Sequence, residues 1–228
     1  NTSRDKAVGV LLHDTMAFTP EGTPLGLLNV QCWARDPEEA GKRYRRKELP
    51  IEEKESFKWL VSYRAVAEAQ KLCPDTMLVS VGDREADIYE LFSEALQDPR
   101  NPRLLVRAER TRQRKVEQEG LWRRMSGEPV AGWLKVRVPR RGSRPARTAK
   151  LQVRYAQVVL RPPKDSPLPP VSVWGVYARE VGYSAEVKEP IDWMLLTTVK
   201  TESFKEASER LMWYSRRWGI EVYHRTVK

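Results

Sequence analysis

The sequence contains only two cysteines, Cys32 and Cys73, and two histidines, His13 and His224. Two cysteines outside any Cys-x-x-Cys spacing exclude a disulfide framework and do not favour structural zinc. So few histidines also argue against histidine-based catalysis. The sequence has no run of about 18 apolar residues and no signal-peptide pattern at its start. These absences favour a folded protein of the reducing cytoplasm.

Basic side chains are concentrated in one region. The 228 residues include 41 Lys and Arg against 31 Asp and Glu, a net charge of +10. Residues 103–164 hold 18 of the basic and 4 of the acidic residues, so this region carries +14 and the remainder −4. A regional excess of this kind is typical of a polyanion-binding surface. Nucleic acid is the natural partner; a membrane surface stays open, but no basic amphipathic helix supports it.

The first half of the chain has an α/β order. The patterns predict a hairpin, a helix, a strand, a helix and a strand, at residues 7–18 with 25–33, 51–72, 76–81, 86–96 and 104–106. Asp83 and Arg107 follow the two single strands. Ligands of open α/β sheets commonly bind beyond the carboxyl ends of strands. Asp83 could also simply cap the helix that follows it.

From about Glu109 the helical signal fades and the pattern becomes β-rich. Strands are predicted at residues 132–138, 149–160 and 171–180, with basic, turn-rich segments between them. This region, 110–189, is predicted to be a β-rich insertion, and its Arg/Gly/Pro turn is equally compatible with a disordered loop. A strand returns at 191–196. Ser203 and Glu206 then predict a capping box at the start of the last helix.

The last helix carries a polar stripe. At helical spacing one side holds Tyr214, Arg217, Glu221 and Lys228. The opposite side is predicted to face the core through Met212, Trp213, Ile220, Tyr223 and Val227. A solvated face with i,i+3 and i,i+4 pairs would explain the stripe without any function.

The spacing of that stripe, Tyr-x2-Arg-x3-Glu-x6-Lys, resembles the signature of DDE transposases of bacterial insertion sequences and composite transposons. A second segment, Asp83-Arg84-Glu85-Ala86-Asp87-Ile88, is similar to the sequence around the second catalytic aspartate of that family. The resemblance spans essentially the whole chain. It implies an α/β fold with an RNase H-like catalytic core, as in the retroviral-integrase superfamily. The core would comprise residues 1–109 and 190–228, with the insertion at 110–189.

The resemblance implies a two-metal site. Asp83 and Glu221 would be two of three carboxylates that hold Mg²⁺ or Mn²⁺, hard ions that prefer oxygen ligands. Two such ions stabilise the attacking and leaving oxygens of phosphodiester cleavage. The third aspartate is expected upstream of Asn1, because Asp14 lies on a strand that matches the second strand of the core. The chain is therefore expected to be truncated at both ends and inactive by itself.

The resemblance also assigns DNA contacts. Tyr214, Arg217 and Lys228 match residues that hold the phosphates of the transposon end, and Arg107 matches a basic residue at the DNA. Trp193 falls where such enzymes stack an extruded base. Trp193 could equally be a core residue.

The function implied is metal-dependent strand cleavage and strand transfer at transposon ends, with a hairpin intermediate possible. The partners would be double-stranded DNA, as terminal inverted repeats and target, and a second copy of the intact protein in a synaptic homodimer. A cytoplasmic, nucleoid-associated location is expected. One alternative is a non-catalytic DNA-binding remnant or domesticated transposase. Another is a structure-selective nuclease of the same fold, which would lack the stripe.

Overall fold

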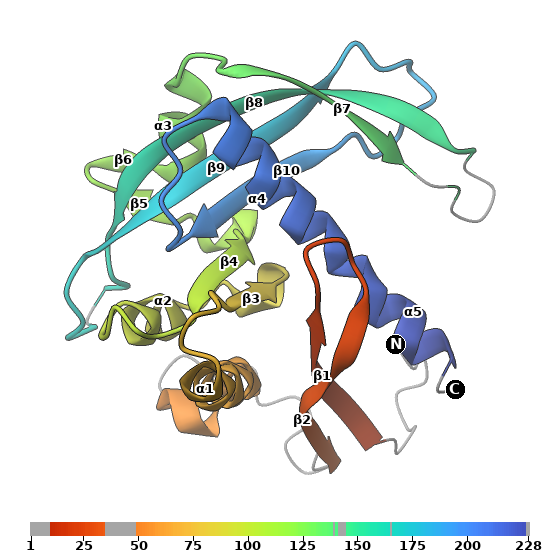
Figure 1. Ribbon diagram of the computed structural model, residues 1–228. Coiled ribbons are helices and arrows are strands. Elements are labelled where there is room, and N and C mark those ends of the chain that lie inside the picture. The colour runs from red at the N-terminus through yellow and green to blue at the C-terminus, as the bar shows by residue number, and fades with distance from the viewer. Residues whose placement is uncertain (1–9, 35–48, 139, 141–144, 165, 227–228) are drawn as a thin grey trace.

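The computed structural model describes residues 10–34, 49–138, 140, 145–164 and 166–226, and has a mixed α/β fold (Figure 1). The strands are β1 (Val10–Phe18), β2 (Pro24–Ala34), β3 (Val79–Gly82), β4 (Arg103–Arg107), β5 (Lys115–Val116), β6 (Glu119–Gly120), β7 (Gly132–Val138), β8 (Arg147–Leu160), β9 (Val171–Val181) and β10 (Asp192–Thr197). The α-helices are α1 (Phe57–Leu72), α2 (Tyr89–Ala95), α3 (Leu121–Gly127), α4 (Phe204–Arg216) and α5 (Trp218–Thr226). Three 3₁₀ turns are η3 (Ile51–Glu53), η4 (Arg84–Ala86) and η5 (Arg110–Arg112).

Most strands belong to one mixed sheet. Its order is β3-β4-β10-β9-β8-β5-β6, and β7 pairs with β8 off this path. Strands β3 and β4 are parallel, whereas β10 pairs antiparallel with both β4 and β9. The strands of the predicted insertion are therefore hydrogen-bonded to strands of the predicted core. The division into core and insertion stays a prediction.

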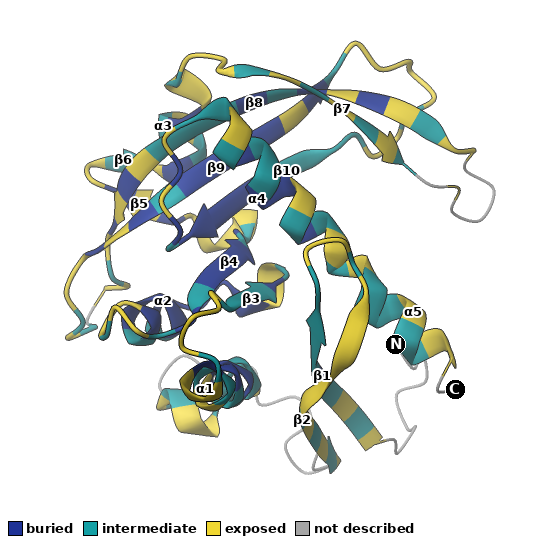
Figure 2. Ribbon diagram, viewed as in Figure 1, coloured by how far each residue is buried: buried dark blue, intermediate teal, exposed yellow. Residues whose placement is uncertain are grey.

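The centre of the sheet, at β4 and β10, is buried on both faces, which explains the apolar runs of these strands. Alternate residues of β4 point to opposite faces of the sheet. Leu104 and Val106 pack in a first core with α1, α2 and α3, whereas Leu105 packs in a second core with α4. Strand β10 divides in the same way. Buried residues accordingly fill the centre of the sheet beneath α4 (Figure 2).

The hairpin β1–β2 forms a separate two-stranded sheet beside α1 and α5 (Figure 1). Gln31 donates from Nε2 to the carbonyl oxygen of Lys58 at 3.0 Å and to Ser62 Oγ at 3.1 Å, which fixes the hairpin on α1. On the other side His224 Nε2 lies 2.9 Å from Asp14 Oδ2. The predicted hairpin is confirmed.

Most predicted elements are found, with local differences in their bounds and a few short elements that were not predicted. The helix predicted at 51–72 begins as α1 at Phe57, after the turn η3. Helix α3 was not predicted, because its seven residues offer only a short apolar signal: Leu121 and Met125, both fully buried, and the partly buried Trp122. None of the helices in the described ranges is long and apolar enough to cross a membrane.

The predicted core face of the last helix is correct only in part: Trp213 packs against the second core, Met212 does not, and Val227 lies outside the described residues. The segment consists of two helices that meet at Arg217, and α5 has no buried residue in its described part. In α4 the buried residues include Ala207, Leu211 and Tyr214, whereas Met212 is 50% exposed. The helix lies on the sheet with the Tyr214 side inward, so the start of the polar stripe is itself buried.

Candidate active site

Asp83 directly follows β3, at the carboxyl end of that strand. Its Oδ1 accepts a hydrogen bond of 2.8 Å from the backbone N–H of Arg84 and so caps the turn η4. The bond confirms the cap that the sequence allowed. The bond also fixes the direction of the carboxylate. Gly82, the preceding residue, packs tightly against the same turn, since a Cβ there would meet Ala86 Cβ at 2.4 Å.

Two side chains from the end of α4 reach Asp83. The hydroxyl of Tyr214 donates to Oδ1 of Asp83 at 3.1 Å across 131 residues of sequence. Arg217 Nη2 lies 3.6 Å from Oδ2 of the same carboxylate. Asp83 is therefore held by its own turn on one side and by α4 on the other.

Arg217 also joins Asp83 to Glu221. The same Nη2 atom donates to Glu221 Oε1 at 3.0 Å, within one turn of helix. Because one nitrogen contacts both carboxylates, their nearest oxygens lie within about 7 Å of one another. Each carboxylate side chain is 33% exposed, so both are accessible to a ligand from solvent.

The groups of this cluster stabilise one another's protonation states. Burial raises the pKa of the Tyr214 hydroxyl, and the negative charge of Asp83 acts in the same direction. Tyr214 is therefore a neutral donor at physiological pH. Burial alone would lower the pKa of Arg217, but Asp83 and Glu221 raise it above its ordinary value, so this guanidinium stays charged.

Arg107 and Trp193 lie beside the same cluster. Arg107 ends β4, its positive charge opposes the rise in the pKa of the Tyr214 hydroxyl, and its Nη2 donates to the carbonyl oxygen of Asp192 at 3.2 Å. The ring of Trp193 meets that of Tyr214 edge-on, with centroids 5.2 Å apart. Tyr214 itself is only 2% exposed, so in this structure it contacts Asp83, and its contact with a DNA phosphate stays a prediction. Lys228 lies outside the described residues.

Sequence reasoning missed one supporting pair. Asp87 is fully buried and forms an ion pair with Arg114, whose side chain is 7% exposed. Asp87 Oδ2 also accepts from the backbone N–H of Glu109 at 2.9 Å, and Arg114 donates to the carbonyl oxygen of Asp87 at 2.6 Å. The pair joins the turn after Asp83 to the segment after β4. The signal in the sequence was the second aspartate of Asp83-Arg84-Glu85-Ala86-Asp87.

The two carboxylates are the right kind of ligand for a hard cation, but there are too few of them for a two-metal site. Asp83 and Glu221 supply oxygen ligands, and Mg²⁺ is often bound by one or two carboxylates together with waters and substrate phosphates. Within the described residues no group of three His, Cys, Asp or Glu side chains could hold a metal ion. Asp14 does not supply the third ligand here, because it pairs with His224. Two carboxylates are enough for one ion at most.

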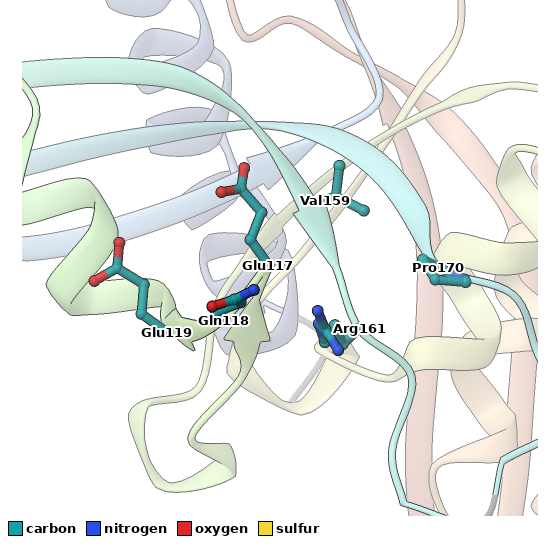
Figure 3. Close-up of a pocket in the computed structure, with 6 residues that line it drawn as sticks. All are labelled: Glu117, Gln118, Glu119, Val159, Arg161 and Pro170. Atoms are coloured by element: carbon teal, nitrogen blue, oxygen red, sulfur yellow. The ribbon is translucent and has the colours of Figure 1, made fainter.

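A recess in the described surface lies elsewhere. Its volume is about 630 Å³, and its lining consists of Glu117, Gln118, Glu119, Val159, Arg161 and Pro170 (Figure 3). Most of these residues belong to the β5–β6 turn and the end of β8, Pro170 directly precedes β9, and none of them was predicted for the site. Glu119 already lies 3.6 Å from Arg123. The recess is therefore separate from the Asp83 cluster.

No family model matches the sequence. The geometry nevertheless brings together Asp83, Tyr214, Arg217, Glu221, Arg107 and Trp193, which is every predicted site residue within the described ranges. Two carboxylates, two guanidinium groups and two aromatic rings meet at the end of β3 and β4. Such a site can neutralise an anionic substrate and offer oxygen ligands beside it.

Proposed function

We propose that this chain is the catalytic core of a DDE-type DNA transposase with an RNase H-like fold. One observation carries the proposal: Arg217 contacts both Asp83 and Glu221, although these carboxylates are 138 residues apart in the sequence. The fold thus joins two motifs whose resemblance to the family was independent. A solvated helix face would not require Asp83 at this place.

Each side chain has a role that follows from its contacts. Tyr214 and Arg84 N–H orient Asp83. Arg217 occupies the space between the carboxylates and lowers their repulsion. With a scissile phosphate bound, Arg107 and Arg217 are the cations placed to contact its oxygens. A bound Mg²⁺ or Mn²⁺ would supply activation of water and stabilisation of charge on the leaving oxygen.

The first test measures metal binding directly. Mn²⁺ should raise the melting temperature of the chain, because a ligand that binds only the folded state stabilises it. Asp83→Asn and Glu221→Gln should each abolish this shift. Asp75→Asn and Glu68→Gln remove exposed carboxylates on other surfaces and should retain it. A shift retained in both site variants would refute the metal site.

A rival proposal is a DNA-binding protein without cleavage activity. It is favoured by the described residues, which offer two carboxylates and not three. Arg107→Ala and Arg217→Ala, measured with labelled duplex DNA as the probe in place of Mn²⁺, separate the two proposals. A chain that binds DNA through Arg107 and Arg217 but shows no Mn²⁺ shift belongs to the rival class.

A further inference from the structure

One face of β7 and β8 presents cations around an exposed tryptophan. Along β7 the exposed residues Trp133, Lys135 and Arg137 alternate with partly buried apolar ones. The apolar residues pack on the core beneath α4, so the alternation places the three exposed side chains on the opposite, outer face. This cationic face is remote in sequence from the Asp83 cluster.

The neighbouring strand extends the cationic face. Lys150 of β8 lies directly opposite Lys135, and its Nζ is 4.3 Å from the centre of the Trp133 ring. Trp133 is 49% exposed despite this contact. Two residues further along β8, Gln152 lies opposite Trp133 of β7 on one side and opposite the exposed Arg179 of β9 on the other. Among the described residues, no carboxylate forms an ion pair with Lys135, Arg137 or Lys150.

The pairing of Lys135 with Lys150 does not stabilise the isolated fold. Like charges directly opposite on two strands are destabilising, and here Lys135 faces Lys150. Charges on an edge strand can prevent sheet aggregation, which would explain the residues of β7. That reason does not extend to Lys150, because β8 is paired on both sides. A polyanion on this face would remove the repulsion.

We propose that the cationic face, Trp133, Lys135, Arg137 and Lys150, binds the backbone of duplex DNA. The first three residues of β8, Arg147–Ala149, pair with β7 but have no partner on β9, so the sheet narrows there to a two-stranded ribbon. The ribbon carries Arg137 and has a width that fits the major groove, whereas Trp133, Lys135 and Lys150 lie on the wider sheet beside it. A lipid surface would need further exposed apolar side chains beside Trp133, and the face offers cations instead.

The test is binding of the chain to a short labelled duplex of arbitrary sequence, at about 50 to 200 mM salt. The triple variant Lys135→Ala, Arg137→Ala, Lys150→Ala should reduce the slope of log affinity against log salt by about 0.9 for each phosphate that is no longer neutralised, or about 2.7 for three. Trp133→Ala should lower affinity at unchanged slope, because it removes an uncharged side chain. The control triple Lys71→Ala, Lys164→Ala, Lys205→Ala removes exposed lysines from other surfaces and should change the slope much less.

The inference shares only its substrate class with the proposed function. An unchanged slope in the first triple variant, or an equal loss in the control, would overturn it and leave the Asp83 site untouched. Loss of binding to anionic vesicles with retained DNA binding would also overturn it. A double variant Lys135→Arg, Lys150→Arg keeps the positive charges, and a salt slope equal to that of wild type in this variant would support the inference. Loss of the Mn²⁺ response in Asp83→Asn, with DNA binding retained, tests the other site alone.

Discussion

Replacing Arg114 with Met should show how much the buried Asp87–Arg114 pair contributes to the stability of the fold. The variant keeps the unbranched apolar stem of the side chain but removes the guanidinium carbon, which lies 5.9 Å from the centre of the Tyr89 ring and 5.5 Å from that of Phe92. It removes the guanidinium from a carboxylate that has no exposed surface. Asp87 keeps one hydrogen bond, from the backbone N–H of Glu109.

The expected loss is large because a charge is left buried without its partner. Breaking a buried ion pair by removing one member costs about 3–5 kcal/mol, and the remaining hydrogen bond places this case near 3 kcal/mol. Domains of this size have a free energy of unfolding of about 5–15 kcal/mol. At about 2–4 °C per kcal/mol, the melting temperature should fall by roughly 6–12 °C.

The assay is urea unfolding of wild type, Arg114→Met, Asp87→Asn and the double variant. The double variant should recover part of the loss, since it no longer buries an unpaired charge. Arg123→Met is the matched control, because Arg123 is 88% exposed and its pair with Glu119 should contribute little. The reasoning fails if Arg114→Met unfolds within about 0.5 kcal/mol of wild type, the range of an ordinary surface change.

Two further predictions concern the same half of the molecule. Gly82→Ala should destabilise the chain by about 1–3 kcal/mol in urea, as overpacking does, because its Cβ would meet Ala86 at 2.4 Å; Gly127→Ala, with nothing within 4 Å, should be close to neutral. Burial, followed by the charge of Lys58, lowers the pKa of His13 to about 4, so the unfolded state takes up a proton first as the pH falls from 6.5 towards 4. The free energy of unfolding should therefore fall over this pH range, and it should fall less in His13→Gln. Equal dependence of the free energy of unfolding on pH in the two proteins, measured with urea, would contradict this.

The sequence determined much of the local structure. The hairpin follows from two apolar runs with Thr, Pro and Gly between them, because those turn residues allow the chain to reverse. The short apolar runs of β4 and β10 were sufficient to predict both strands, and these runs are apolar because both faces of the sheet are covered there. The two motifs, through their resemblance to the transposase signature, were sufficient to single out Asp83, Tyr214, Arg217 and Glu221 as site residues.

The tertiary structure decided which sides of these elements are buried and which groups meet. A helical pattern shows that Met212 and Tyr214 point in different directions, but only the sheet beneath α4 determines that Tyr214 is inside. Asp87 and Arg114 are ordinary charges in the sequence, and their burial depends on two loops that approach from β3 and β4. Local periodicity fixes directions around one element, whereas burial and ion pairing depend on contacts between segments distant in sequence. The approach of Asp83 to Glu221 across 138 residues is of this second kind.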